Sequence, residues 1–331
     1  MKNSKISIII CTRNSAKTIR LVLDSIVLQA KIKAIEEVII VDYLSSDDTL
    51  KIINDSIRSF PIIKFVLLNC LAPGKAPALI MGLNYTNADA AVIVDDDNIL
   101  DPYFVTNILP ILTEPNIGLI GTNGIADNNL ILPDWFNDFS GCYAVGCVPD
   151  KPFVTWVWGA GCVITMKAWE ALKIRGYSFI LNPAREDNSV PISIGGEDVE
   201  LALAIRLIGF ELRVCSSAKY IHAFPQSRLT TNYLIKNARG VSRSTAVHTI
   251  YRILISQKKL LYPKFNFNLL FFRNLLGNLR LLIYYLITFN FLKVKYYLAV
   301  IIGQLEGYLI FKNRFNVIYE ELSKLKYKSH K

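Results

Sequence analysis

Charged residues are scarce in this chain, and it lacks the repeated long apolar runs of a polytopic membrane protein. Only 19% of its 331 residues are charged, whereas 52% are apolar. That balance is apolar for a soluble protein, so we expect more than a simple globule. The length allows one large α/β domain with an extra segment, or two modest domains.

Recognisable cysteine motifs and a secretory leader are also missing. The six cysteines lie in apolar contexts, without a C-x-x-C pair or a histidine at metal-binding spacing. We therefore expect buried, reduced thiols. Residues 1–5 lead directly into an apolar run and lack the charged and hydrophobic regions of a signal peptide, which favours a cytoplasmic location.

Acidic side chains are almost absent from the C-terminal third. Residues 1–218 carry 18 basic and 24 acidic side chains, whereas residues 219–331 carry 19 basic and 3 acidic ones, giving net charges of −6 and +16. The basic residues of this third lie among Leu, Phe, Tyr and Ile. An anionic membrane surface therefore fits the segment better than nucleic acid, for which no binding motif is present.

Residues 265–311 contain two apolar runs that are interrupted by charges such as Arg280, Lys293 and Glu306. Each run is shorter than the ~18 apolar residues that a spanning helix requires. Helices that lie in the membrane interface explain this mixture best, with tyrosines at headgroup depth. A re-entrant or spanning hairpin and a soluble helical subdomain stay open as alternatives.

Short β-branched runs alternate with amphipathic segments in the first 100 residues. The expected strands are 6–11, 37–42, 63–68 and 90–95, and the expected helices are 15–30, 47–58 and 76–87. Such alternation predicts a mostly parallel sheet flanked by helices, with ligands bound beyond the carboxyl ends of the strands. Further strand candidates are 118–122, 153–165 and 211–215, and 197–208 is an expected amphipathic helix.

Carboxylates stand where two of these strands end. Asp42 closes one strand, and Asp95, Asp96 and Asp97 close another. Side chains alternate along a strand, so Asp95 and Asp97 would share a side and could bind Mg²⁺ or Mn²⁺ together with substrate phosphates. Asp42 could accept a hydrogen bond from a base or a ribose. Turns or helix caps are the plain alternative for both groups.

A second acidic pair, Glu197 and Asp198, follows Gly195 and Gly196 at the start of the expected helix. Acids are favoured at a helix N-terminus by its dipole, which is the plain explanation. The glycines also permit close approach of a substrate. A carboxylate at this position could remove the proton from an acceptor hydroxyl.

Three further groups are candidates for ligand contacts. His222 is a possible metal ligand, although a lone histidine is more often an ordinary polar residue. Trp156 and Trp158 could form a platform for a sugar ring or simply pack. The basic residues that could face phosphate or lipid are Arg228, Lys236, Arg239 and Arg243.

Five pieces of the sequence together resemble the inverting glycosyltransferase family 2, which has the GT-A fold. They are SIIICTRN at 7–14, VDYLSSDDT at 41–49, VDDDNIL at 94–100, WGAGCVI at 158–164 and GGEDVEL at 195–201, with KNARGVSR at 236–243 as a weaker sixth. They follow the family order over roughly residues 5–245. We therefore expect a GT-A nucleotide-sugar-binding and catalytic domain over 1–245 and a basic, apolar, membrane-associated helical region over 246–331.

The resemblance implies a role for each matching acid. Asp42 would bind the donor base or ribose, Asp95 the nucleotide sugar, and Asp97 the metal. Asp198 would be the catalytic base, with Glu197 orienting it or touching the acceptor. The expected donor-binding set is Thr12, Arg13, Asn14, Asp42, Lys75, Asp95, Asp96, Trp158 and Arg239, and the expected metal ligands are Asp97, Asp95 and His222.

One piece departs from the family pattern. The family usually has a second acid, then Gly and Ser, after the position of Asp42, whereas this chain has Tyr43, Leu44 and Ser45. The preferred base is therefore open. The Gln-x-x-Arg-Trp motif of processive synthases is not visible, which favours transfer of a single sugar.

The implied activity is transfer of a sugar, with inversion, from a nucleotide diphosphate donor to a hydroxyl of a glycan or lipid-linked acceptor. Mn²⁺ or Mg²⁺ would assist, and the enzyme would act at the cytoplasmic face of a membrane as a peripheral or monotopic protein in surface polysaccharide or lipid-linked glycan synthesis. A dehydrogenase would need G-x-G-x-x-G where this chain has CTRNSAKT. The remaining alternatives are a sugar nucleotidyltransferase, although its Gly-rich loop is missing, and a membrane-bound scaffold without activity.

Overall fold

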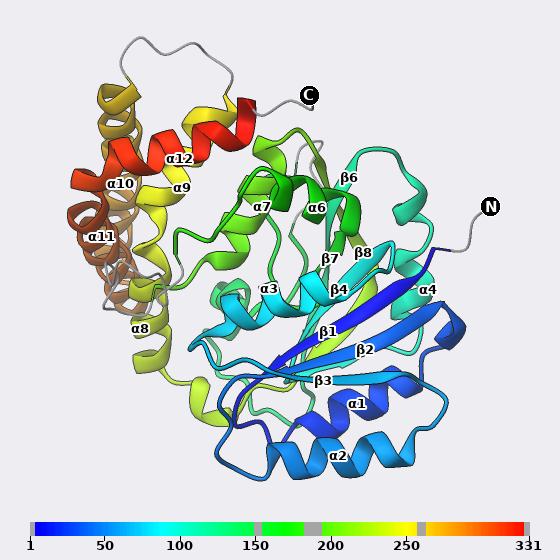
Figure 1. Ribbon diagram of the computed structural model, residues 1–331. Helices are drawn as coiled ribbons and strands as arrows, with labels where there is room; N and C mark the ends of the chain where they lie inside the picture. Colours follow the sequence, from blue (N-terminus) through cyan, green and yellow to red (C-terminus); the bar gives the residue numbers. More distant parts are fainter. Residues whose placement is uncertain (1–3, 149–153, 182–193, 257–262, 328–331) are drawn as a thin grey trace.

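The computed structural model describes residues 4–148, 154–181, 194–256 and 263–327. In Figure 1 a twisted sheet crosses the molecule, with helices beside it and a further group of helices at one end. The strands are β1 (Ile6–Thr12), β2 (Ile35–Asp42), β3 (Phe65–Asn69), β4 (Ala90–Asp95), β5 (Asn98–Leu100), β6 (Ile117–Ala126), β7 (Val163–Thr165) and β8 (Glu211–His222). The helices are α1 (Ile19–Val27), α2 (Thr49–Ser59), α3 (Lys75–Tyr85), α4 (Phe104–Ile108), α5 (Phe136–Phe139), α6 (Met166–Ile174), α7 (Glu197–Leu207), α8 (Thr231–Ser242), α9 (Thr245–Ile255), α10 (Pro263–Ile287), α11 (Phe291–Phe311) and α12 (Phe315–Tyr327).

The strands form one mixed sheet in the order β3-β2-β1-β4-β7-β6-β8-β5. β1 runs parallel to β2 and β4, and β2 runs parallel to β3. This N-terminal half has the parallel arrangement that the alternating sequence predicts. The other half is mixed, because β7 is antiparallel to β4 and β6 while β6 and β8 are parallel.

The strand candidate at 153–165 is mostly not a strand. Residue 153 lies outside the described residues, residues 154–162 form no strand, and β7 takes only the last three positions. Gly161 has a φ of 65°, which an extended strand cannot contain. The loop formed in this way lets Trp158 and Gly159 reach the carboxyl edge of the sheet.

Both faces of the inner parallel strands β1, β2 and β4 are largely buried, whereas β3 at the edge of the sheet is only partly covered. Ile8 and Ile10 of β1 pack in one apolar cluster with α1, α2 and α4, whereas Ile9 and Cys11 pack in a second cluster with α3 and α7. Alternate residues of a strand face opposite layers, so each strand needs apolar side chains at every position. That is why these segments are continuous apolar runs in the sequence.

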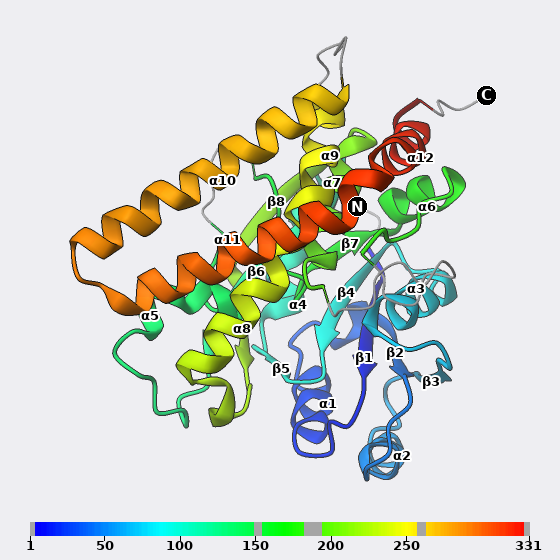
Figure 2. The same ribbon diagram turned by 90° about the vertical axis from the view of Figure 1, so that its left-hand side faces the viewer.

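The C-terminal helices belong to the second of these clusters. Tyr251 of α9, Phe271 of α10, Phe311 of α11 and Leu322 of α12 are buried in it together with α7. Figure 2 shows α10 and α11 as two long neighbouring helices, with α8 and α9 between them and the sheet. The domain division at 245/246 stays a prediction, and the packing continues across it.

Helix α11 docks onto α8 through two glycines that lie one turn apart. A Cβ at Gly303 would overlap the carbonyl oxygen of Arg239, and a Cβ at Gly307 would overlap that of Arg243. Between the glycines, Glu306 accepts hydrogen bonds from both guanidinium groups, at 3.1 Å from Arg239 Nε and 2.8 Å from Arg243 Nε. The only acid of α11 therefore faces the protein.

We expect Gly307→Ala to lower the free energy of unfolding by about 1–3 kcal/mol, because the new methyl group meets fixed backbone. Gly240→Ala is the matched control, since nothing lies within 4 Å of a Cβ there. That change should raise stability by up to about 1 kcal/mol, as alanine favours a helix. Thermal unfolding followed by circular dichroism measures both; equal effects would contradict the close α8–α11 contact.

Candidate active site

The carboxyl ends of three parallel strands lie at one edge of the sheet. In the strand register, Thr12 of β1 is opposite Asp42 of β2, and Cys11 is opposite Asp95 of β4. The acids that end β2 and β4 therefore flank the loop that follows β1. This is the edge where an open α/β sheet binds its ligands.

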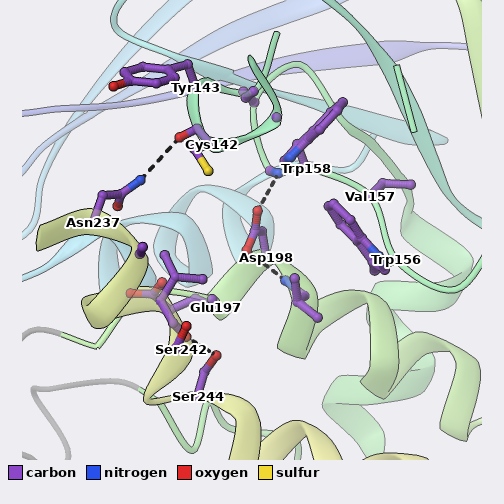
Figure 3. Close-up of a pocket in the computed structure, with 18 of the residues that line it drawn as sticks. Cys142, Tyr143, Trp156, Val157, Trp158, Glu197, Asp198, Asn237, Ser242 and Ser244 are labelled. Atoms are coloured by element: carbon purple, nitrogen blue, oxygen red, sulfur yellow. Dashed lines mark hydrogen bonds between the residues drawn. The ribbon is translucent and has the colours of Figure 1, made fainter. Parts of the chain in front are cut away.

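A cavity of about 890 Å³ opens beside this edge. Six of the residues expected from the sequence line it: Lys75, Asp95, Trp158, Glu197, Asp198 and His222. Figure 3 shows the part of the wall that is made by the start of α7, the 156–158 loop and α8. Tyr285 of α10 and Tyr297 of α11 also line the cavity. The pair of helices α10 and α11, which we call the apolar hairpin, therefore forms one of its walls.

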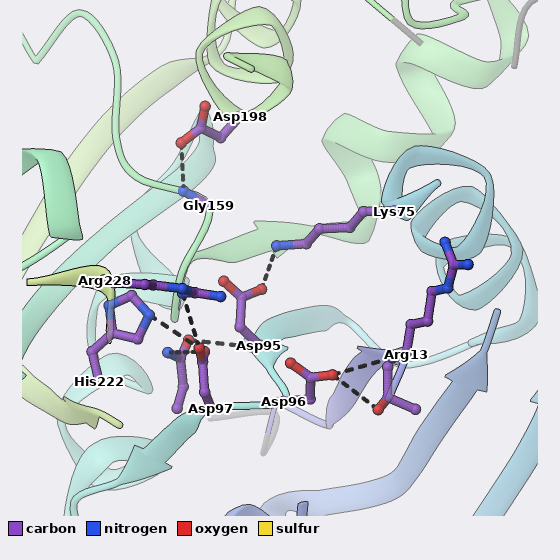
Figure 4. Close-up of polar contacts among 11 residues, drawn as sticks. Arg13, Lys75, Asp95, Asp96, Asp97, Gly159, Asp198, His222 and Arg228 are labelled. Carbon is purple, nitrogen blue, oxygen red and sulfur yellow. Dashed lines mark hydrogen bonds and ion pairs between the residues drawn. The ribbon is translucent and has the colours of Figure 1, made fainter. Parts of the chain in front are cut away.

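Lys75 at the start of α3 binds Asp95 directly (Figure 4). Burial by itself would lower the pKa of Lys75, but the carboxylate of Asp95 outweighs it and raises that pKa. The ammonium group is thus held charged inside the cavity. Burial raises the pKa of Asp198, and the positive charge of Lys75 partly opposes that rise.

Asp97 faces two basic side chains (Figure 4). Its Oδ1 lies 3.3 Å from His222 Nε2, and its Oδ2 lies 3.5 Å from Arg228 Nη1. Burial would raise the pKa of Asp97, but His222 and then Arg228 lower it overall. Burial would likewise lower the pKa of His222, and Asp97 raises it. Each of the two groups therefore favours the charged form of the other.

The tautomer of His222 tests whether a metal ion fits here. Its Nδ1 donates to the carbonyl oxygen of Tyr143 at 2.7 Å, so the lone pair of neutral His222 is on Nε2 and points at Asp97. Two acceptors 3.3 Å apart need a proton or a cation between them, and a histidine oriented by a carbonyl is a usual metal ligand. Among the described residues, however, no three His, Cys, Asp or Glu side chains are placed to hold a metal ion. Asp97 and His222 fit a cation that also takes oxygens from a substrate, whereas Asp95 is engaged by Lys75.

Asp96 turns away from these groups and ties β4 to the loop after β1. Its Oδ2 accepts hydrogen bonds from Thr12 Oγ1 at 2.9 Å and from the backbone N–H of Arg13 at 3.2 Å. Burial first, and then the charge of Asp97, raises the pKa of Asp96 to about 6. These contacts fix the loop after β1 against the end of β4.

The loops after β1 and β2 are joined by Asn14. Its backbone N–H donates to Ser45 Oγ at 2.9 Å, and its side-chain oxygen accepts from the Ser46 N–H at 2.8 Å. Leu44 has a φ of 68°, a left-handed conformation that glycine adopts most easily. The backbone thus keeps the shape expected of the family's glycine although this chain has leucine there.

Asp42 is buried with an unused oxygen. Asp42 is 3% exposed. Its Oδ2 accepts a hydrogen bond from the Ser45 N–H at 3.2 Å, whereas its Oδ1 has no hydrogen-bond partner within the described part of the chain. A buried acceptor without a donor is costly. A ligand that donates to this oxygen would remove that cost.

Asp198 lies in the first turn of α7, and two backbone N–H groups hold its carboxylate. Gly159 N–H donates to Oδ2 at 3.0 Å, and Val199 N–H donates to Oδ1 at 2.8 Å. Burial raises the pKa of Asp198 against these hydrogen bonds. Burial also raises the pKa of Glu197 beside it. A carboxylate with a raised pKa at a cavity wall has the properties of a general base.

Two supports of α7 were not expected from the sequence. His248 of α9 donates from Nε2 to the carbonyl oxygen of Gly196 at 3.1 Å, directly before Glu197. Glu200, which is fully buried, accepts hydrogen bonds from the backbone of Ile180 and Leu181 and from Tyr251 Oη at 3.2 Å. An acid on the apolar side of the expected helix was a signal for Glu200. No local pattern indicated His248, which lies 52 residues from its partner.

Some predicted site residues do not line the cavity described above: Thr12, Arg13, Asn14, Asp42, Asp96, Asp97 and Arg239. The first six lie at or just after the ends of β1, β2 and β4, whereas Arg239 lies on α8 and its guanidinium pairs with Glu306 of α11. Its predicted contact with the donor stays a prediction. Trp158 does line the cavity and meets Trp156 edge to face, with ring centroids 5.6 Å apart.

We expect His248→Gln to alter the pH dependence of stability. Burial, and then the nearby Arg252, lower the pKa of His248 from 6.5 to about 3, so the unfolded chain binds a proton there that the folded chain does not. The wild type therefore loses stability as pH falls from about 6.5 towards 3. The glutamine variant should lose about 1 kcal/mol less per pH unit in urea unfolding across this window. Parallel curves for the two proteins would contradict a buried, neutral His248.

Residues 7–141 match the model of the family described as glycosyl transferase family 2. No curated protein matches the sequence. Among solved structures, the mannosyltransferase PcManGT from Pyrobaculum calidifontis, in complex with GDP-Man and Mn²⁺, is 16% identical with a TM-score of 0.54 over 97% of this chain and 85% of that one. TarS 1-349 from S. aureus, in complex with UDP-GlcNAc, is 15% identical with a TM-score of 0.53 over 98% of this chain and 93% of that one.

At these identities the two structures establish the fold alone. Both structural matches extend over the C-terminal helices, since each covers nearly the whole of this chain. The family match covers the strands β1, β2 and β4, whose ends hold Asp42 and Asp95 to Asp97. Residues 7–141 therefore match glycosyl transferase family 2, and the chain that contains them has a GT-A-like fold.

Proposed function

We propose that this protein is an inverting glycosyltransferase that transfers one sugar from a nucleotide diphosphate donor to a hydroxyl of a membrane-borne glycan or lipid-linked acceptor. The observation that carries the proposal is the position of Asp198. Its carboxylate is oriented by two backbone donors at the wall of a cavity whose other side holds Lys75, Asp95 and His222. A base and a phosphate-binding side thus face one space.

The donor would lie along the carboxyl edge of the sheet. The unpartnered Oδ1 of Asp42 suits a ribose hydroxyl or a base N–H. Lys75 and Arg228 line the cavity and supply positive charge for the phosphates. PcManGT is described with GDP-Man and TarS with UDP-GlcNAc, which supports a nucleotide sugar as the donor class.

Asp97 and His222 would hold a divalent cation, Mn²⁺ or Mg²⁺, with the rest of its ligands supplied by the diphosphate. PcManGT is described with Mn²⁺. Such a cation stabilises the negative charge that develops on the leaving nucleotide diphosphate. Asp97 keeps a lowered pKa and so stays ionised for this contact, and Tyr143 holds the His222 ring in the required tautomer.

Asp198 would accept the proton of the attacking hydroxyl. Attack from the side opposite to the leaving diphosphate inverts the anomeric carbon in one displacement, without a covalent intermediate. Glu197 lies next to Asp198 on the cavity wall and would contact the acceptor. Trp158, which also lines this part of the wall, offers an apolar face to a sugar ring.

Several features support action at a membrane. Two helical stretches, Pro263–Ile287 and Phe291–Lys326, are long and apolar enough to cross a membrane by length and composition. Ile287, Phe289 and Phe291 at the turn between α10 and α11 are 69%, 76% and 62% exposed. The exposed surface of α10 also carries Arg273 and Arg280, which favours a position in the interface over a span. We place this face against the cytoplasmic leaflet, with the protein bound peripherally or monotopically.

We expect Asp198→Asn to lower turnover by about a hundredfold or more, because the base is lost while donor contacts remain. Release of nucleoside diphosphate from donor and membrane acceptor measures turnover, and calorimetry measures nucleotide affinity. In the wild type, activity should fall at low pH with a limb above the ordinary range of an aspartate, since burial raises the pKa of Asp198. Near-normal turnover of the variant would remove Asp198 from the mechanism.

We expect Asp97→Asn to abolish the dependence of nucleoside diphosphate affinity on Mn²⁺. The change deletes the charge that faces His222 and Arg228 and leaves the apolar packing intact. Titration with a panel of nucleoside diphosphates, with and without Mn²⁺, measures this effect. Asp55→Asn, at an exposed position on α2, is the control and should keep the Mn²⁺ dependence. Retention of that dependence by Asp97→Asn would contradict the metal role.

A further inference from the structure

A second cavity, of about 420 Å³, lies between α9, α10 and α11. Its polar lining residues are Thr245, Arg252, Arg273, Asn274, Asn278 and Gln304. We call it the helix cleft. Thr245 and Arg252 also line the first cavity, so the two spaces adjoin across the start of α9.

The helix cleft is rich in hydrogen-bond donors and positive charge. It has two guanidinium groups and three side-chain amides, and no acid is among its lining residues within the described ranges. Neither Arg252 nor Arg273 forms an ion pair with any residue that the structure describes. Burial, and then the charge of Arg206, lowers the pKa of Arg252. Two uncompensated cations beside several amide donors fit an oxyanion.

Gln304 adds an unpartnered donor to the helix cleft. Gln304 is 5% exposed and lines the helix cleft. Its Oε1 accepts a hydrogen bond from Asn278 Nδ2 at 3.1 Å, whereas its Nε2 has no partner in the part of the chain that the structure describes. The amide group can donate to an acceptor that enters the cleft. An oxyanion oxygen in the cleft would be that acceptor.

The surroundings of the helix cleft indicate where the oxyanion comes from. α10 and α11 carry many of the large exposed apolar side chains of the protein, including Leu269, Leu276 and Leu309. Helices of this kind lie against lipid acyl chains, with phosphate groups at the level of their polar residues. A phosphate attached to a lipid therefore reaches a cleft between these helices more readily than a soluble anion does.

We propose that the helix cleft binds the phosphate group of an anionic membrane lipid. Arg252 and Arg273 neutralise its charge, and Gln304 and Asn274 donate to its oxygens. The site lies beside the cavity that holds Asp198, so the bound headgroup orients the hairpin wall of that cavity relative to the membrane. The proposal goes beyond glycosyl transfer and does not depend on it, because lipid binding is measured without donor or acceptor.

Sedimentation with vesicles of phosphatidylcholine, with and without phosphatidylglycerol, tests the proposal on the full-length chain. Arg273→Gln should weaken binding to the phosphatidylglycerol vesicles by about tenfold or more. Arg280→Gln is the matched control: it makes the same charge change on the same helix but does not line the helix cleft. Loss of the diffuse attraction of one charge should weaken vesicle binding of this control by about fivefold at most. Equal losses in the two variants would overturn the proposal.

Gln304→Met separates the site from net charge. It removes the unpartnered donor without changing charge, and we expect it to weaken phosphatidylglycerol binding several-fold, which diffuse attraction would not do. Unchanged binding would overturn the proposal. Thermal midpoints and nucleoside diphosphate affinity serve as controls for folding and for the proposed function, and either can fail independently of lipid binding.

A soluble source of phosphate is distinguished in a third arm. Inorganic phosphate at low ionic strength should neither raise the thermal midpoint of the wild type nor release it from phosphatidylglycerol vesicles beyond the effect of chloride at equal ionic strength. A larger effect of phosphate that is lost in Arg273→Gln would assign the site to a free anion and overturn the lipid assignment.

Discussion

The arrangement of this protein depends on keeping several buried carboxylates together at one edge of a sheet. Like charges at such distances repel, and burial disfavours each of them further. Each of the three acids at the end of β4 has its own partner. Lys75 pairs with Asp95, Thr12 donates to Asp96, and His222 and Arg228 pair with Asp97. These partners come from α3, β1, β8 and η4 (Gln226–Arg228), so the acidic cluster constrains how these four elements meet.

Much of this edge could be predicted from the sequence because its signals are local. Continuous β-branched runs that end in acids identify buried parallel strands, and parallel strands bring their carboxyl ends together. Asp42 and Asp95 are in adjacent registers with β1 for this reason. Gly195 and Gly196 before two acids similarly indicate the start of α7. The resemblance to the family implies roles that spacing alone leaves open, and the family pattern still fits at Leu44, where the backbone keeps a left-handed conformation.

The features that escaped prediction are contacts between segments far apart in the chain. Arg239 looks like a phosphate ligand in its own segment, but Glu306 of α11 pairs with it 67 residues later. The carbonyl of Gly196 is held by His248, and the backbone near Ile180 is held by Glu200 together with Tyr251. A pattern within a window of one helix carries no information about such partners. The small residues Gly303 and Gly307 were visible, but only the position of α8 explains them.

The hairpin of α10 and α11 connects an exposed apolar surface to the first cavity through one continuous structure. α11 is fixed to α8 by its two glycines and Glu306, and α8 contributes Asn237 and Ala238 to the cavity wall. The same hairpin presents Tyr285 and Tyr297, stacked with centroids 5.4 Å apart, to that cavity, while Phe289 at its turn is exposed. A shift of the hairpin would therefore move a wall of the cavity that Asp198 also lines. On the function proposed above, binding to a membrane and access of an acceptor to Asp198 would depend on the same element.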